Sequence, residues 1–245
     1  MRFLLVSDVH KTYKIYKGRD ESVAVKWLLR VINRTNPDVL ISAGDWDEGM
    51  SQEDFAMISS KVELLTVYGN HENFQLIKSL AMPDGKVFLK GGLKIAGING
   101  LIEENEKKAY SITREQFINA VYRIERNLRK LQERMTYEGE ARYKDAMPRL
   151  DILVTHHPPY IPEIYPYMTD EYGRLVFDAV ERLKPRLFLN GHMKGGCYSY
   201  YQFPSGTKYI RVDSSQSFRC YGVLESEENR VTVYDDGKEE FSFDF

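Results

Sequence analysis

The chain has 245 residues, and its 34 Lys and Arg against 36 Asp and Glu give a formal net charge of -2. This balance argues against the strongly basic footprint of a dedicated nucleic-acid-binding domain, although bound cations would add local positive charge. With 42% hydrophobic residues the chain can fill a sizeable core, and its length favours one large domain.

Cysteine usage and the absence of long apolar runs bear on where the protein works. Cys197 and Cys220 are too few for a disulfide framework and lack zinc-site spacing, so we expect two core thiols in a reducing compartment. The N-terminal run Phe3–Val6 is too short for a signal peptide, and no run approaches the roughly 18 apolar residues of a membrane-spanning helix. These features predict a soluble, cytoplasmic protein.

The first half of the chain alternates between predicted strands and helices. Short apolar runs that end in polar residues predict strands at 3–6, 39–42, 64–68, 86–89 and 94–98. Apolar residues at helical spacing predict helices at 20–35, 53–60 and 73–80, the first of them ended by Asn36-Pro37. This alternation predicts a mainly parallel sheet covered by helices.

Residues 103–149 form a predicted helical insertion in this single domain. Thr113 and Gln116 make a capping box, and a helix follows with one apolar stripe. The stripe consists of Phe117, Val121, Ile124, Leu128, Leu131 and Met135. We expect this helix, 113–136, to dock on the body of the protein. The alternatives are a seam between two copies in a homodimer and a cap over the functional site.

The last hundred residues return to strands. The predicted elements are strands at 151–155 and 186–189, with a helix at 175–183 between them. From Cys197 to Phe245, alternating Tyr, Val, Thr and Phe between turns predict antiparallel strands.

Five predicted strands end in residues that carry chemistry. The five pieces are DVH (8–10), GD (44–45), GNHE (69–72), THHPP (155–159) and GHMK (191–194), and they hold all five histidines. Ligands of open α/β sheets bind outside the carboxyl ends of the strands, so we expect these loops to converge on one crevice. Two residues apart on an extended segment, Asp8 and His10 would point the same way. Carboxylates, imidazoles and an amide suit manganese, iron or zinc.

The order of the five pieces resembles the calcineurin-like metallophosphoesterases, whose pattern is D-x-H, GD, GNH with an acid, a histidine before a proline-rich turn, and G-H-x-H. The resemblance spans almost the whole chain. It implies an α/β fold in which two mixed sheets pack as a sandwich flanked by helices, over residues 1–245. It also implies a metal-dependent phosphoesterase, in which a hydroxide that bridges two divalent ions attacks phosphorus.

The family's roles carry over only to matched positions. Asp8, His10 and Asp45 would hold the first metal ion, and Asp45, Asn70, His156 and His192 the second. His71 would lie near the leaving group as a general acid or phosphate contact, and its presence slightly favours phosphodiesters over monoesters. His157 is the histidine that we expect to have a structural role.

Two positions depart from the family's pattern. The family often has an acid or amide three residues after the aspartate of GD and a glycine later. Here GDWDEG is one residue shorter, Glu48 takes the place of that acid, and Trp46 is unusually large. Lys194 stands where the family has a histidine ligand, and a protonated lysine has no lone pair to offer a cation. Lys194 follows His192 by two residues and would lie on the same side of an extended segment. The interpretation that we favour is a weak first metal site, with Lys194 binding the substrate. The alternatives are an ion pair with Asp8 or Glu48, and loss of activity.

Two other functions remain open from the sequence. One is a non-catalytic interaction protein on the same fold, with a degenerate first metal site. The other is a nuclease, in which the insertion and the Tyr-rich loop after Pro159 grip single-stranded nucleic acid by charge and stacking. Residues 103–149 hold eleven Lys or Arg against nine Asp or Glu, which supports the nuclease only weakly.

Overall fold

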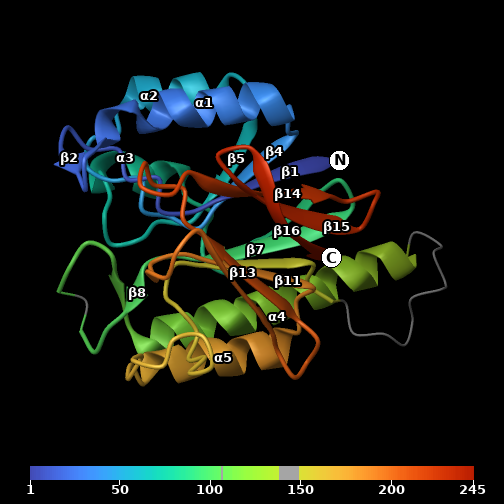
Figure 1. Ribbon diagram of the computed structural model, residues 1–245. Coiled ribbons are helices and arrows are strands. Elements are labelled where there is room, and N and C mark those ends of the chain that lie inside the picture. The colour runs from blue at the N-terminus through green and yellow to red at the C-terminus, as the bar shows by residue number, and fades with distance from the viewer. Residues whose placement is uncertain (106, 138–148) are drawn as a thin grey trace.

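Two six-stranded mixed sheets lie face to face, with helices on both outer faces (Figure 1). The computed structural model describes residues 1–105, 107–137 and 149–245. The predicted sandwich of two mixed sheets flanked by helices is therefore confirmed. Within the described part of the chain, no helix has the length and apolar character needed to cross a bilayer.

The first sheet is built around the N-terminal strand. Its strands, side by side, are β16 (Lys238–Asp244), β15 (Arg230–Asp235), β14 (Cys220–Glu225), β1 (Arg2–Val6), β4 (Val39–Ser42) and β5 (Glu63–Thr66). β1, β4 and β5 run parallel, whereas β14 pairs with β1 antiparallel. Phe3 and Leu5 face the second sheet, while Leu4 and Val6 face the helices. Burial on both faces explains why β1 is a continuous apolar run.

The second sheet contains one strand whose pairing the sequence did not reveal. Its strands are β12 (Tyr198–Gln202), β13 (Lys208–Val212), β11 (Leu187–Asn190), β10 (Ile152–Thr155), β7 (Leu93–Ile98) and β6 (Val87–Lys90). The prediction of purely antiparallel strands after Cys197 is wrong for β13, which pairs parallel with β11. Alternating side chains report which face of a strand is buried, and they do not report the direction of its neighbour.

Helices close both outer faces of the sandwich (Figure 1). The first sheet packs against α1 (Ala24–Thr35), α2 (Gln52–Ser59) and α3 (Phe74–Leu80), and the second against α4 (Arg114–Tyr137) and α5 (Tyr172–Leu183). The smaller elements are β2 (Ile15–Tyr16), β3 (Arg19–Asp20), η1 (Glu21–Val23), β8 (Leu101–Ile102) and β9 (Ser111–Ile112). The β2–β3 hairpin was not predicted, because strands of two residues each are too short to show an alternating pattern.

The long helix α4 docks on the body of the protein, as predicted. The N–H of Thr113 donates to Oε1 of Gln116 at 2.8 Å, and the N–H of Gln116 donates to Oγ1 of Thr113 at 3.2 Å, which confirms the capping box. Phe117, Val121, Ile124 and Leu128 are buried in the core that α4 shares with α5 and the second sheet. A homodimer through this helix stays a prediction. Its interface would have to use the faces of α4 that do not dock on the body of the protein. Residues 138–148 of the predicted insertion, and the side chain of Met135, lie outside the described residues.

Replacing Leu128 by glutamate should lower the free energy of unfolding by about 3 kcal/mol or more, because a charge would be buried without a partner. Molar mass should not change. Thermal unfolding and light scattering measure both quantities. Arg129→Glu, at an exposed position on the same helix, is the matched control and should be close to neutral. A change in mass at unchanged stability would contradict docking on the body.

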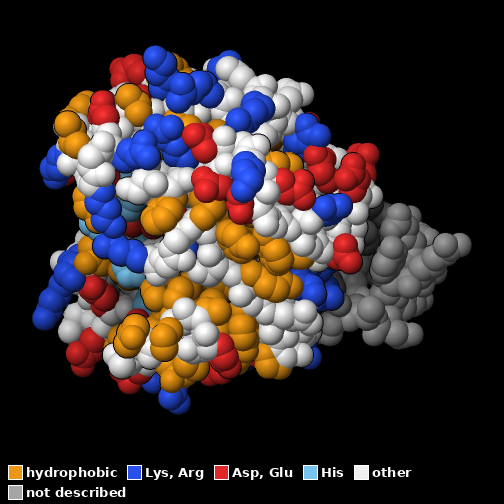
Figure 2. All heavy atoms as spheres, viewed as in Figure 1, with side chains coloured by type: hydrophobic (Ala, Val, Ile, Leu, Met, Phe, Trp, Pro, Cys, Tyr) orange, Lys and Arg blue, Asp and Glu red, His pale blue; other side chains and the backbone are white. Residues whose placement is uncertain are grey.

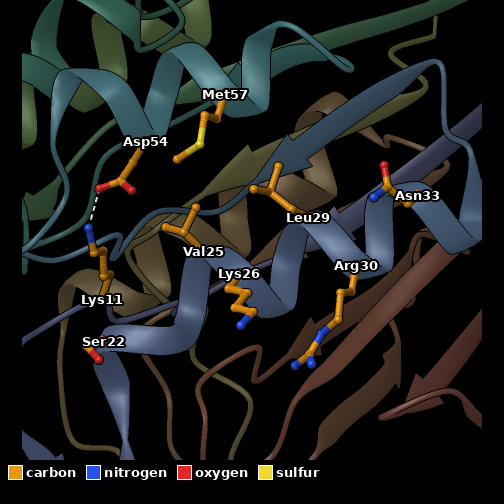
Figure 3. A pocket seen from close by; sticks show the side chains of 9 residues that line it. All are labelled: Lys11, Ser22, Val25, Lys26, Leu29, Arg30, Asn33, Asp54 and Met57. Carbon is orange, nitrogen blue, oxygen red and sulfur yellow. Dashed lines mark hydrogen bonds and ion pairs between the residues drawn. The ribbon is translucent and has the colours of Figure 1, made fainter.

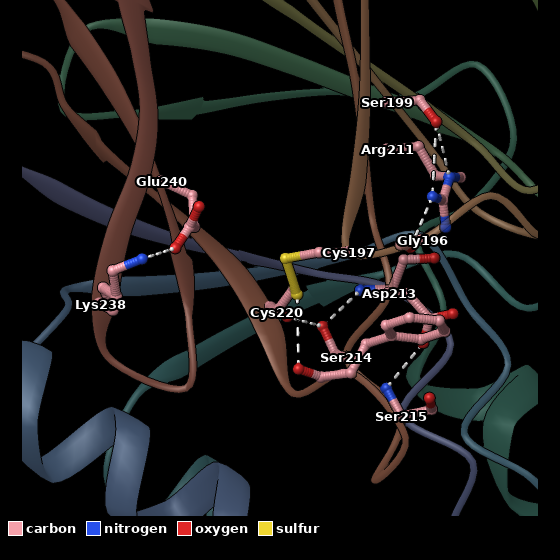
Figure 4. Close-up of a disulfide and its surroundings, with 12 residues drawn as sticks. Gly196, Cys197, Ser199, Arg211, Asp213, Ser214, Ser215, Cys220, Lys238 and Glu240 are labelled. Atoms are coloured by element: carbon pink, nitrogen blue, oxygen red, sulfur yellow. Dashed lines mark hydrogen bonds and ion pairs between the residues drawn. A yellow bond between two sulfur atoms is a disulfide. The ribbon is translucent and has the colours of Figure 1, made fainter. Parts of the chain in front are cut away.

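The two cysteines are joined, contrary to the prediction of two thiols. Cys197, just before β12 of the second sheet, forms a disulfide with Cys220, which opens β14 of the first sheet (Figure 4). The Cα atoms lie 5.5 Å apart, within the ordinary range for a disulfide. The sequence could not show this pairing, because it depends on two sheets placing their strands face to face.

Candidate metal centre

The carboxyl ends of β1, β4, β5, β10 and β11 bring the predicted ligands together from both sheets. Two groups form, one of Asp8, His10 and Asp45 and the other of Asp45, His156 and His192. Within each group the ligand atoms all lie within 4.8 Å of one another. Asp45 belongs to both groups, which is the position that a carboxylate shared by two ions requires.

Left-handed backbone shapes the loops that carry these side chains. The φ angles are 54° at Asp8, 48° at His10, 58° at Asp45 and 68° at His192. The predicted extended geometry of Asp8-Val9-His10 is therefore wrong, although both side chains do reach the same group. Hydrogen bonds hold this bend, since the N–H of Asp8 donates to the Gly44 carbonyl at 2.9 Å and that of His10 to the Asp45 carbonyl at 3.0 Å. Asp and His are among the residues that adopt this conformation most readily.

Asp47 orients the ring of His10. Its Oδ2 lies 2.9 Å from Nδ1 of His10, so Nδ1–H donates to Asp47. The other ring nitrogen, Nε2, lies 3.9 Å from Asp8 and 3.8 Å from Asp45, and it carries the lone pair once the ring is neutral. Carboxylates commonly hold metal-binding histidines in this way. Asp47 was not singled out from the sequence, although an acid two residues after the GD piece was a readable signal.

The ring of His156, which follows a strand of the second sheet, is fixed by a backbone carbonyl that follows a strand of the first sheet. Its Nδ1–H donates to the Ala43 carbonyl at 2.7 Å, so Nε2, which lies 3.3 Å from Asp45 Oδ1, is the nitrogen that carries the lone pair once the ring is neutral. Buried Asn190 holds the loop behind it, since its Nδ2 donates to the His156 carbonyl at 2.9 Å and to the His157 carbonyl at 3.1 Å. The structure thus places the first histidine of the pair in the group, as predicted.

Asn70 and His192 complete the second group. Oδ1 of Asn70 lies 2.9 Å from Nδ1 of His192 and 3.3 Å from Nε2 of His156. The backbone N–H of His192 donates to Oδ1 of Asp8 at 3.1 Å, which ties the loop after β11 to the loop after β1. An oxygen and two imidazole nitrogens therefore converge beside Asp45.

Glu72, the acid of GNHE, ties two of the loops together. Its carboxylate accepts the N–H of Asp45 at 2.8 Å, of Gly69 at 2.9 Å and of Trp46 at 3.2 Å. Burial, with the charge of Asp45 adding to it, raises the pKa of Glu72 to about 8. The sequence offered no role for this residue, because its partners lie in a loop some 25 residues earlier.

The charges of the centre fit a divalent cation. Burial and the nearby charge of Asp45 raise the pKa of Asp8 to about 6. Burial also opposes protonation of His10 and His156, yet their carboxylate neighbours win and raise both pKa values to about 9. Two imidazoles thus hold protons where carboxylates crowd together, and their oriented Nε2 atoms point inward. Metal ions can take the place of those protons, because ligand nitrogens must be neutral.

His71 and His157 lie outside both groups. His71 is exposed at the rim, with its ring centroid 5.4 Å from that of His10, and its N–H donates to Oδ1 of Asp45 at 2.9 Å. His157 is buried, accepts the N–H of Ile102 at 3.0 Å and has Nε2 3.0 Å from Asp170. His157 therefore ties the β8 segment to the loop before α5, as its predicted structural role requires.

The two departures from the family's pattern end in different places. Trp46 is buried and donates from Nε1 to Oγ1 of Thr66 at 3.0 Å, so it belongs to the core. Glu48 is exposed and lies 3.8 Å from Lys14. Lys194 is also exposed, and within the described ranges it forms no ion pair with Asp8 or Glu48. The chain is not extended between His192 and Lys194, because it turns at His192, where the N–H of Met193 donates to the Gly191 carbonyl at 2.8 Å.

Lys11 anchors the His10 segment on the helical face. Its side chain reaches Asp54 of α2, and it borders a hollow of about 410 Å³ between α1 and α2 (Figure 3). The backbone holds the same segment, since the N–H of Lys11 donates to Trp46 at 2.9 Å and its carbonyl accepts the N–H of Gly49 at 3.1 Å. None of the predicted ligands lines this hollow. The role of Lys11 here is therefore to position the His10 segment.

A cationic hollow adjoins the GNHE loop. It has a volume of about 380 Å³ and is bordered by Tyr68, two residues before Asn70. Lys78, Lys108 and Arg123 line it, against a single acid, Asp84. Histidine side chains are also visible at the left of the molecule among Lys and Arg side chains (Figure 2). Lys108 is paired with Glu103 at 3.0 Å, so the hollow carries a modest excess of positive charge.

Comparison with known proteins agrees with this site. The model of the calcineurin-like phosphoesterase family matches residues 1–195, which include all the predicted ligands. A search of curated proteins gives no match.

Solved structures with TM-scores of 0.62 and 0.52 illustrate the likeness in fold, and a third is similar at a lower score. One aligns with 96% of this chain and 98% of its own, with a TM-score of 0.62 and 13% identity. A 5'-nucleotidase from Candida albicans SC5314 has a TM-score of 0.52 and 12% identity over 96% of this chain and 52% of that one, so this chain spans about half of its length. An archaeal phosphodiesterase has a TM-score of 0.49 and 11% identity over 96% of this chain and 99% of its own.

Proposed function

The chain belongs to the calcineurin-like phosphoesterase family, and from this premise we propose that it is a metal-dependent hydrolase of phosphate esters, with phosphodiesters slightly preferred over monoesters. The observation that carries the proposal is the position of Asp45 in both ligand groups. Each group brings at least three Asp and His side chains together, although Lys194 replaces one histidine ligand of the first. This retention supports an enzyme, with a weak first metal site, over a non-catalytic protein with a decayed site.

The side chains divide the work as follows. Asp8, His10 and Asp45 would hold one divalent ion, and Asp45, Asn70, His156 and His192 would hold the other. Bound manganese, iron or zinc supplies Lewis acidity toward phosphoryl oxygens and lowers the pKa of water. Asp47 keeps Nε2 of His10 free, and the Ala43 carbonyl does the same for His156. Lys194 remains a substrate contact in this proposal, because it is a cation without a partner in the described part of the chain.

His71 gives a proton to the leaving oxygen. It is exposed, follows Asn70 directly and makes no side-chain hydrogen bond among the described residues, so its ring is available to a substrate. A general acid must come within hydrogen-bond reach of the atom that it protonates, and the rim beside His10 satisfies this condition.

His71→Asn should leave the metal content nearly unchanged. Turnover should fall about 100-fold or more for esters with alkoxide leaving groups, which need the proton most, and much less for nitrophenolate esters. Steady-state rates on the two ester types, with metal analysis of each preparation, measure this difference. Equal losses on both types would exclude the general-acid role.

The cationic hollow beside Tyr68 supports the preference for diesters. Its volume of about 380 Å³ leaves room for a leaving group, and its three cations attract a charged one. A nuclease is the variant of this proposal in which the leaving group is a nucleotide chain. The direct test is hydrolysis of nitrophenyl phosphate and bis(nitrophenyl) phosphate by metal-loaded protein. Metal-loaded protein that hydrolyses neither ester would contradict the proposal.

Metal binding should release about two protons per chain at pH 7, because His10 and His156 have pKa values of about 9 in the metal-free chain and must lose their protons to bind. His192 contributes none, since its pKa is lowered to about 4, first by burial and then by His156. Metal affinity should therefore rise with pH up to about 9 and level off above it. Titration calorimetry in buffers of different ionisation enthalpy counts the protons, and a heat independent of buffer would count against these ligands.

A further inference from the structure

The disulfide lies at the far end of the loop that carries His192. Cys197 follows His192 by five residues, and Cys220 opens the strand that pairs with β1, the strand before Asp8. Both cysteines lie beyond residues 1–195, the part matched by the family model. The bridge is therefore a feature of this chain beside the site, and it needs its own explanation.

The His192 loop is held at its two ends and free between them. At one end His192 donates to Asp8. At the other, the Gly196 carbonyl accepts from Nη2 of Arg211 at 2.9 Å, and the Cys197 carbonyl accepts the N–H of Asp213 at 2.9 Å (Figure 4). Lys194 and Gly195 between them are exposed. Besides its contacts with Asp8 and Asn70, His192 therefore depends on how firmly the second end of its loop is fixed.

A chain of hydrogen bonds joins Cys220 to Asp8. The Cys220 carbonyl accepts from Oγ–H of Ser214 at 2.7 Å, and Oγ of Ser214 accepts the N–H of Ser7 at 3.2 Å. The hydroxyl of Ser7 donates to the carboxylate of Asp8. One half of the disulfide is therefore tied to the ligand loop of the first sheet, and the other half begins where the His192 loop ends.

The ligands themselves come from both sheets. Asp8, His10, Asp45 and Asn70 follow strands of the first sheet, whereas His156 and His192 follow strands of the second. Any sliding of one sheet edge over the other would separate His192 from Asp45. A covalent bond between the two sheets, next to the loop that carries His192, opposes that movement directly.

We propose that Cys197 and Cys220 are positioning residues, whose disulfide holds His192 in place for the metal ion shared with Asp45, Asn70 and His156. The inference rests on the proposed function. A water-soluble phosphine opens the bridge, because the sulfur–sulfur bond breaks to two thiols while phosphorus takes an oxygen from water, whose protons go to the sulfurs. The reduced chain binds this ion more weakly.

The test measures Mn²⁺ affinity by titration of metal-free protein. The variant Cys197→Ser/Cys220→Ser, and wild-type protein reduced with the phosphine and then desalted anaerobically, should bind the ion at His192 about 10- to 100-fold more weakly than the oxidised wild type. Ile124→Ala, which removes buried side-chain volume from α4 far from the loop, is the control for lost stability and should keep wild-type affinity.

A second arm separates positioning from a general structural role. In a His192→Ala background, opening the disulfide should change Mn²⁺ affinity less than twofold, because the ligand that the bridge positions is already gone. Wild-type affinity in the double-serine variant, or an equal loss in the His192→Ala background, would overturn the inference while the proposed function stands. Oxidised wild-type protein that binds no Mn²⁺ at all would overturn both.

Discussion

Asp45→Asn should lose most of its bound metal and at least three orders of magnitude in kcat, about 4 kcal/mol in activation free energy. Asp45 is the carboxylate common to both ligand groups, and asparagine keeps its size while removing its charge. The His71 N–H can still donate to the remaining carbonyl oxygen, so the loop should keep its course. Metal analysis and steady-state kinetics on the same preparation measure both losses.

The matched control is Asp170→Asn. Asp170 lies 3.0 Å from His157 near the same crevice but belongs to neither ligand group. It should therefore retain metal and most activity. Circular dichroism should show that both variants are folded. An Asp45→Asn protein with the metal content of the wild type would rule out a carboxylate shared by two ions.

Gly69→Ala should impair metal binding nearly as severely. A Cβ at residue 69 would lie 2.1 Å from Oδ1 of Asp45 and 2.5 Å from Nε2 of His156, so one of these ligand atoms must move. The backbone itself would accept alanine, because Gly69 does not lie in the left-handed region. We expect metal affinity to fall by about 100-fold, which corresponds to about 3 kcal/mol.

Gly195→Ala is the control for Gly69→Ala. Its added Cβ would meet nothing closer than 3.7 Å, although residue 195 lies in the His192 loop. Titration of metal into both variants should give a weakened site for Gly69→Ala and an unchanged one for Gly195→Ala. Comparable affinities in the two variants would show that Asp45 and His156 can move aside without loss.

The ligand pieces could be predicted because each is contiguous and follows a strand. Asp8, Asn70 and His192 sit in short polar stretches after apolar runs, and parallel strands must end at a common edge. Asp47 and Glu72 are visible in the sequence as acids beside these pieces, but their partners could not be assigned, since those depend on which loop lies across from them. The disulfide was missed for the same reason, because the two cysteines meet only when the two sheets pack face to face.

Backbone conformation was the other limit. The extended reading of Asp8-Val9-His10 and of His192-Met193-Lys194 assumed that a strand continues past its last residue, whereas left-handed turns begin at once. In the first case Asp8 and His10 do converge, but for a reason that was not predicted: hydrogen bonds to Gly44 and Asp45 bend the chain. In the second case the turn leaves Lys194 in solvent. The alternation of side chains along a strand then does not predict where the Lys194 side chain points.

The central place of β1 has a consequence for biosynthesis. Residues 3–6 pair on one side with 39–42 in β4, and residues 2–5 pair on the other side with 222–225 in β14. A chain emerging from the ribosome can form the first pairing early, but the second edge of β1 stays open until nearly the whole protein has been made. An open apolar strand edge favours aggregation. A fragment that ends at residue 195 would contain every predicted ligand, yet it would lack the strand that covers this edge and should not fold into a minimal enzyme.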